Sequence, residues 1–218
     1  MPVKLNEREY REYPEFCDER KAEVRMLEDG QEVVEGYATT WDEYLLWDDG
    51  EYRMFERIDQ HAYDECDLSD VIFQLNHEGR VFARGSNKTL IVRPDEKGLF
   101  NRAYLSGTEA GRQLREEIKG GYIDRMSLCM HVSKDERTDY WEDTLKSTVV
   151  IRRILEVDKL YDVSAVSRPA NEATEISARS FADGVIEELK AREQREADKR
   201  QNRERMQEEI RQLLVGKK

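Results

Sequence analysis

The sequence predicts an α+β protein that is mainly β, with one helix among the strands and one long helix at the C-terminal end. Three observations predict this fold class. Short runs of β-branched and aromatic residues, divided by Gly, Asp and Asn, fill residues 32–166. A capped helical pattern interrupts them at residues 108–121. From residue 183 onward the chain is rich in charge and contains no proline, which favours an uninterrupted helix.

The predicted strands are short apolar or alternating runs, each bounded by turn-forming residues. They cover residues 32–41, 52–58, 71–76, 88–94, 98–105, 123–132 and 147–157.

The helix at residues 108–121 has both a start and a stop signal. Thr108 is the expected N-cap, Leu114 and Ile118 lie four residues apart on one face, and Gly120-Gly121 ends the pattern. We also expect a short helical turn between His61 and Asp67.

The chain divides by composition into an N-terminal arm (1–20), a folded domain (21–178) and a charged helical tail (179–218). From residue 183 the tail has ten basic and nine acidic residues, so the excess negative charge lies in the preceding residues. Its apolar residues lie mainly at its two ends, and its middle has too few apolar residues for a strong coiled coil. Either the tail is a solvated helix or disordered segment, or it docks on a partner or self-associates.

The net charge of -12 argues against a nucleic-acid partner, because contacts to phosphate require clustered Lys and Arg. Three widely spaced cysteines, Cys17, Cys66 and Cys129, form no CxxC pair and fit a reducing compartment. No run of about 18 apolar residues occurs, so we expect no membrane association and no secretion.

Serine hydrolysis needs a base within hydrogen-bond reach of the hydroxyl. Ser127 and His131 lie on one predicted strand about 13 Å apart, so His131 is excluded as that base. His77 follows a buried run and precedes a turn, from which it can project into a cleft. Core packing of Ser127 and a solvated strand-end His77 remain open on these grounds. His61 is more simply a surface residue than a zinc ligand with Asp64 and Cys66.

The order of several short motifs is more specific than any one of them. They are "EGYATTW", "FERIDQHAYDE", "FQLNHEGRVFARG", "TEAGRQLREEI", "IDRMSLCM" and "ILEVDKLYDVSAVSRPANEAT". Together they resemble the prohead proteases of tailed bacteriophages, the HK97-type capsid maturation serine proteases, over roughly residues 20–178. The chain departs from the usual family pattern at Gln60-His61 and at Met126–Met130, so a cleavage preference cannot be transferred.

The resemblance implies a herpesvirus assemblin-like fold, a curved β-barrel wrapped by helices, and a serine endopeptidase that needs no cofactor. Carried over by position, Ser127 is the nucleophile and His77 the base, and Glu156 is the closest match to the third member. Asp162 is the alternative to Glu156. We expect the strand that ends at His77 and the strand that carries Ser127 to lie side by side.

The resemblance also implies partners: the major capsid protein with its scaffold segment, and the protease itself through self-cleavage, inside the procapsid in the host cytoplasm. Homo-oligomer formation is expected from the fold's viral relatives. Two other functions remain open. One is a catalytically idle assembly or scaffolding protein on the same fold. The other is a cysteine hydrolase that uses Cys129, although a free cysteine is commonly plain core.

Overall fold

The computed structural model of the chain describes residues 8–11, 21–167 and 172–215. It contains two compact units, Lys4–Arg179 and a second that consists mainly of Ser180–Lys218. The first unit holds the sheets and the second holds most of the C-terminal helix.

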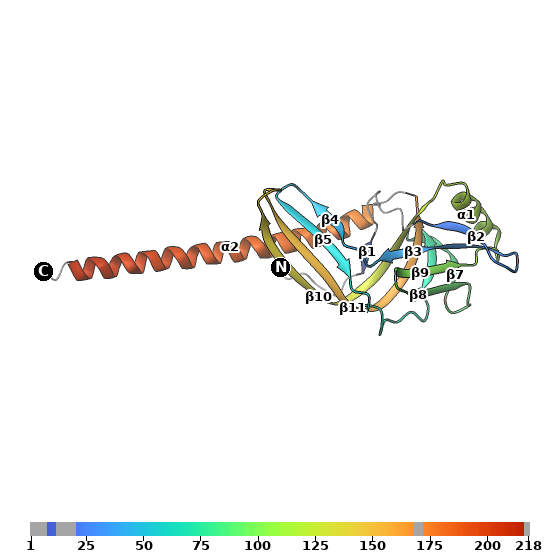
Figure 1. The fold of residues 1–218 in the computed structure, drawn as a ribbon, viewed down its shortest axis with the longest axis horizontal. Coiled ribbons are helices and arrows are strands. Elements are labelled where there is room, and N and C mark those ends of the chain that lie inside the picture. The colour runs from blue at the N-terminus through green and yellow to red at the C-terminus, as the bar shows by residue number, and fades with distance from the viewer. Residues whose placement is uncertain (1–7, 12–20, 168–171, 216–218) are drawn as a thin grey trace. The chain divides into compact units, whose positions relative to one another are not determined.

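The larger sheet is organised around two long antiparallel strands, β10 (Arg125–Glu142) and β11 (Ser147–Val166), drawn side by side in Figure 1. Register shifts in β10 between Cys129 and Asp135 interrupt the regular pairing, and such bulges bend and twist strands. The other members of this sheet are β1 (Glu9–Arg11), β4 (Tyr44–Asp48), β5 (Tyr52–Ile58), β6 (Ile72–Leu75) and β7 (Glu78–Arg84).

The edges of β10 and β11 determine where these shorter strands bind. The strand β1 pairs antiparallel with β10, on the edge that does not face β11. On its other edge β11 carries two parallel partners, β5 near its start and β6 near its end. The strand β6 therefore reaches β10 only across β11.

The smaller sheet has four antiparallel strands in the order β2-β3-β9-β8. These are β2 (Glu23–Met26), β3 (Glu32–Thr40), β8 (Leu90–Pro94) and β9 (Gly98–Ala103). The helix α1 (Glu109–Lys119) packs on β2 and β3, and buries Leu114 and Ile118. The Thr108 hydroxyl caps α1 by accepting a hydrogen bond from the Gly111 amide at 3.0 Å.

The core lies where the two sheets meet through β3 and β10. Alternating residues of both strands point into it, as expected for strands with one buried face. Its fully buried members include Val34, Ala38, Phe73, Leu99, Leu128, Met130 and Val163. Packing in this core fixes β10, β11 and β6 relative to each other.

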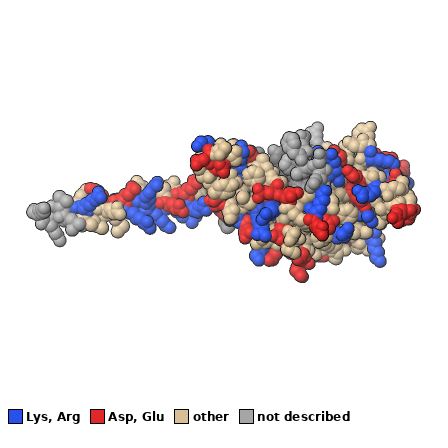
Figure 2. Space-filling view, viewed as in Figure 1, with Lys and Arg blue, Asp and Glu red and all other residues tan. Residues whose placement is uncertain are grey.

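The helix α2 (Glu172–Val215) is continuous through the predicted tail, and Figure 2 shows its Lys and Arg interspersed with Asp and Glu. Pairs such as Arg205 and Glu209, one turn apart, are typical of a solvated helical face. Within the described residues, neither helix combines the length and apolar character needed to cross a membrane.

The α+β class with a mostly β body is confirmed, and every predicted strand has a counterpart. The last two predicted strands extend much further, to Glu142 and Val166. The predicted helical turn near His61 is a series of hydrogen-bonded turns. No closed barrel is present among the described residues, where both sheets stay open. Most of the predicted N-terminal arm lies outside the described residues, but residues 9–11 are a strand of the main sheet.

Candidate active site

Three neighbouring strands bring the candidate residues together. In the order β10, β11, β6, Ser127 pairs with Ser164, and Ser164 pairs with Gln74. The expectation that the two outer strands lie side by side is wrong, because β11 separates them. The middle strand contributes Asp162 to the same place.

His77 sits in the two-residue turn between β6 and β7. Asn76 and His77 have φ angles of 53° and 59°, both in the left-handed region, as a type I′ hairpin turn requires at its two central positions. Asn76 tolerates this conformation well, and its Oδ1 accepts a hydrogen bond from the Ser167 amide at 3.0 Å. This bond ties the turn to the end of β11, so the position of His77 is fixed from two strands.

Both ring nitrogens of His77 have hydrogen-bond partners. Its Nε2 lies 2.5 Å from the Ser127 Oγ, and its Nδ1 lies 2.6 Å from the Asp162 Oδ1. The side chains of His77 and Asp162 are only 3% and 8% exposed, so water competes little for these bonds. Because a carboxylate only accepts, Nδ1 carries the proton, which leaves Nε2 as an acceptor that faces the Ser127 hydroxyl.

Asp162 is itself held in place by its own strand. The Ser164 hydroxyl donates to Asp162 Oδ1 at 2.8 Å, and both residues are buried. A buried carboxylate needs such donors, since an unpaired charge in the interior is costly. The arrangement fixes the carboxylate against the imidazole before any substrate binds.

Glu156 lies elsewhere, and the geometry favours Asp162 for the third position. The Glu156 carboxylate is 59% exposed and pairs with Lys134 at 2.8 Å. Lys134 and Glu156 are also register partners across β10 and β11. Glu156 thus takes part in a surface ion pair and has no contact with His77.

The other sequence candidates do not join this group. His131 contacts Asp158 at 2.5 Å, and His61 contacts Asp64 at 3.1 Å on the surface. Among residues 8–11, 21–167 and 172–215, no three His, Cys, Asp or Glu side chains are grouped closely enough to hold a metal ion.

Cys129 is a poor nucleophile in this environment. It is 1% exposed, and burial raises the pKa of its thiol to about 12. Since the thiolate is the reactive form, a thiol that stays protonated at neutral pH is inert. The Cys66 thiol behaves alike, with a pKa raised by burial to about 12.

Ser127 has a second contact, one that the sequence does not predict. The backbone carbonyl oxygen of Arg11, the last residue of β1, lies 2.8 Å from the Ser127 Oγ. Tyr10 of the same strand packs edge-on against the His77 ring, with centroids 5.0 Å apart. Residues 9–11 are a short polar segment without the apolar alternation of a strand. Their contact with Ser127 is therefore visible only in the folded structure.

The Arg11 side chain points to the opposite face, into a buried ionic cluster. It bonds to Glu56 through Nε and through Nη2, the latter at 2.8 Å, and it also bonds to Glu9. Arg152 binds Glu56 at 2.9 Å and Glu9 at 2.6 Å. Burial would raise the pKa of Glu56, but the positive charges of Arg11 and Arg152 outweigh it and lower that pKa.

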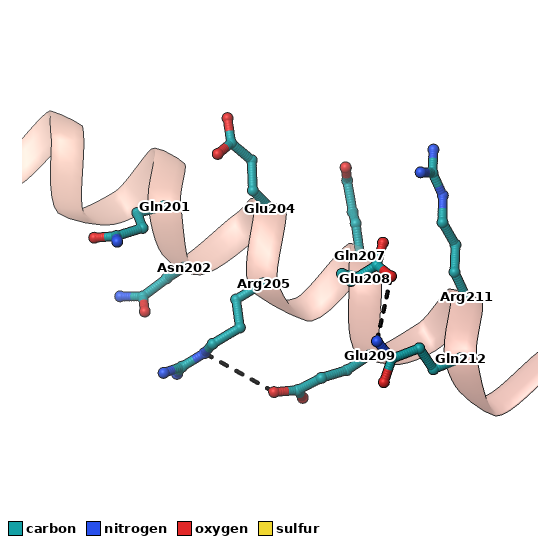
Figure 3. Close-up of a pocket in the computed structure, with 9 residues that line it drawn as sticks. All are labelled: Gln201, Asn202, Glu204, Arg205, Gln207, Glu208, Glu209, Arg211 and Gln212. Atoms are coloured by element: carbon teal, nitrogen blue, oxygen red, sulfur yellow. Dashed lines mark hydrogen bonds and ion pairs between the residues drawn. The ribbon is translucent and has the colours of Figure 1, made fainter.

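A surface hollow on α2 is a weaker candidate site. Figure 3 shows that its nine lining residues all come from this one helix, with Gln212 bonded to Glu208 at 3.3 Å and Arg205 paired with Glu209. These are contacts within the helix itself. The hollow has no nucleophile with an adjacent base, whereas the group around Ser127 has both.

Comparison with known proteins agrees with this chemistry. The family model described as "Caudovirus prohead serine protease" matches residues 20–186, about three quarters of the chain. No curated protein and no solved structure matches the chain. The matched region includes Ser127, His77 and Asp162, and it begins after β1.

Proposed function

Because this chain belongs to the caudovirus prohead serine protease family, we propose that it cleaves peptide bonds with Ser127 as nucleophile, His77 as base and Asp162 as the acid that orients the base. The observation that carries the proposal is the continuous hydrogen-bonded chain from Ser127 Oγ through both nitrogens of His77 to Asp162. This replaces the expected Ser127-His77-Glu156 set.

The mechanism follows from these positions. His77 Nε2 takes the Ser127 proton as Oγ attacks the carbonyl carbon, and later gives that proton to the leaving amine. Asp162 keeps the proton on Nδ1 and stabilises the imidazolium that forms. Burial of this pair strengthens its electrostatic interaction relative to water.

The family acts in phage capsid maturation. The proposed substrates are scaffold segments of the major capsid protein, and the protease itself, within the procapsid. The herpesvirus assemblin-like fold belongs to the same proposal, supported by the mostly β body in which the three strands meet. The charged helix after residue 178 would serve as an addressing segment for a partner in the procapsid, and homo-oligomer formation remains part of the proposal.

The alternative is a catalytically idle assembly protein on the same fold. An idle fold has no need to bury a serine, a histidine and an aspartate in one hydrogen-bonded group.

Co-expression with the neighbouring capsid protein tests the proposal, with intact-mass measurement of both chains. We expect the scaffold segment to be removed by the wild-type chain and retained with Ser127→Ala. Labelling by a fluorophosphonate probe should be lost in Ser127→Ala and kept in Cys129→Ala. An intact capsid protein together with an unlabelled wild-type chain would favour the idle assembly protein.

A further inference from the structure

The N-terminal strand β1 lies where an extended substrate would lie. It adds to the free edge of β10 with Glu9 opposite Met130, Tyr10 opposite Cys129 and Arg11 opposite Leu128. Ser127 is the β10 residue next to Leu128, and its Oγ lies 2.8 Å from the Arg11 carbonyl oxygen. The carbonyl of Arg11 is therefore the one that lies at the proposed nucleophile.

Strand addition is a general way for proteins to bind extended peptides. Backbone hydrogen bonds supply affinity, and pockets for alternate side chains supply specificity. Tyr10 points to the face of His77, while Glu9 and Arg11 point to the opposite face. The chain's own residues 9–11 thus show how a bound peptide would distribute its side chains.

The pocket that holds the Arg11 side chain is built for a cation. Glu56, at its centre, is fully buried, and the Tyr44 hydroxyl also donates to it. From β11, Arg152 contacts two carboxylates outside β1, Glu56 at 2.9 Å and Asp135 at 2.6 Å. A further positive charge balances the cluster, and Arg11 supplies it while being only 1% exposed.

We propose that β1 occupies the substrate strand of this protease, so that the enzyme cuts after arginine and cuts its own chain between Arg11 and Glu12. This inference rests on the proposed function of Ser127. It names the substrate class: an extended peptide whose residue before the cleaved bond carries a guanidinium that binds Glu56.

The covalent step balances without a further reactant except water. Ser127 Oγ bonds to the carbonyl carbon of Arg11 as its proton passes to His77. The bond from that carbon to the nitrogen of Glu12 breaks, and His77 protonates the departing amine. Water then hydrolyses the ester, which leaves a carboxylate on Arg11, a free amino group on Glu12 and an intact Ser127.

While β1 is in place it also limits the enzyme in two ways. The Ser127 hydroxyl has one hydrogen, for which His77 Nε2 and the Arg11 carbonyl oxygen compete. While β1 remains attached it also covers the β10 edge that a capsid segment needs. Cleavage after Arg11 releases residues 1–11 and opens that edge, so processing of the chain precedes processing of the capsid protein.

Mass spectrometry of the chain co-expressed with the capsid protein tests the inference. We expect the wild-type chain to lose residues 1–11, with a new N-terminus at Glu12, and Ser127→Ala to keep them. Arg8→Ala is the matched control, because Arg8 is an exposed arginine three residues earlier that stacks on Tyr161. That variant should be cut after Arg11 as the wild type is.

A peptide series avoids the risk that variants of the buried Arg11 fail to fold. The decapeptide NEREYREYPE copies residues 6–15, and its sixth residue is changed to lysine, alanine or glutamate. With the wild-type chain we expect the arginine peptide to be cut at least about 100-fold faster than the alanine or glutamate peptide, because a buried carboxylate rejects ligands that leave it unpaired. Lysine should be intermediate, since it keeps the charge but lacks the planar fork.

The outcomes separate this inference from the proposed function. Suppose that the scaffold segment is removed in a Ser127-dependent manner, but residues 1–11 stay attached or every cut follows a residue other than arginine. Either result overturns the inference and leaves the protease assignment standing. If the wild-type chain cleaves neither the capsid protein nor itself, both the inference and the proposed function are overturned.

Discussion

Replacing Asp162 by asparagine isolates the role of the carboxylate that faces His77. The change keeps the side-chain shape but removes the charge from a 2.6 Å contact between two nearly buried groups. A hydrogen bond to a charged group contributes about 1.5–3 kcal/mol. At about 1.4 kcal/mol for each factor of ten, that bond alone accounts for roughly 10- to 150-fold in rate.

The loss of orientation adds to this value. An asparagine amide can place its NH2 group against Nδ1, which favours the tautomer with its proton on Nε2, and His77 then cannot accept from Ser127. The same change in well-known triads costs about 10,000-fold in kcat. We therefore expect Asp162→Asn to slow cleavage of the capsid protein by between about 100- and 10,000-fold.

The assay is a time course of scaffold removal, followed by intact mass with purified chains at equal concentration. Glu156→Gln is the matched control, because it neutralises another carboxylate of β11, one that is 59% exposed and paired with the surface residue Lys134. Its rate should stay within about threefold of wild type, since exposed ion pairs contribute about 0–1 kcal/mol. Circular dichroism and thermal unfolding establish that both variants are folded.

Wild-type turnover in Asp162→Asn would falsify the assignment of the acid. A large loss in Glu156→Gln, with its fold intact, would restore that residue to the site and contradict the geometry. Equal small losses in both variants would mean that water, and no carboxylate, orients the imidazole.

Three further predictions concern the same region. Ser127→Ala and His77→Ala should each abolish scaffold removal to a similar extent, since nucleophile and base act as a unit, and their double variant should be no slower than either alone. Cys129→Ala should keep its activity and iodoacetamide should not inactivate the wild type, because burial holds the pKa of that thiol at about 12; rapid inactivation through Cys129 would contradict the buried environment. Burial alone would raise the pKa of Glu9, but the charges of Arg11 and Arg152 outweigh burial and lower that pKa from 4.5 to about 2. Glu9 therefore stabilises the fold above pH 4.5 by roughly 3 kcal/mol, and this contribution is lost as the pH falls toward 2. Urea unfolding at pH 7 and pH 3 in the Ser127→Ala background, where β1 is retained, should show a smaller difference after Glu9→Gln.

Local signals in the sequence predict much of the fold. The β-branched run at residues 52–58 is β5 to the residue, and Thr108 caps α1 as its pattern indicates. The outer end of β10 differs from the prediction because residues 133–142 are mostly polar or exposed, Tyr140 and Trp141 among them. Propensity favours strand there, but no apolar alternation marks it.

At the site, motifs in the sequence identify some of the residues, but the relative positions of the side chains follow only from the fold. His77 and Ser127 were identified from motifs, and the structure brings their side chains into contact. The sequence cannot decide between Glu156 and Asp162, because the two lie an even number of positions apart and a period of two places them on one face. The pairing shifts between Leu160 and Asp162, where Cys129 faces Asp162 and Met130 faces Leu160. That irregularity re-aims the side chains, and no residue pattern marks it.

The order of strands at the site also constrains how members of this family can vary in length. Since β11 places Asp162 between the strand that leads to His77 and the strand of Ser127, adding or deleting one residue within Val157–Asp162 would rotate Asp162 to the opposite face and disconnect it from His77. The turn at residues 143–146, which joins β10 to β11 far from the site, has no such restriction. Insertions and deletions among related proteases should therefore accumulate at that turn and avoid the segment before the acid, a pattern that an alignment of relatives can verify or refute.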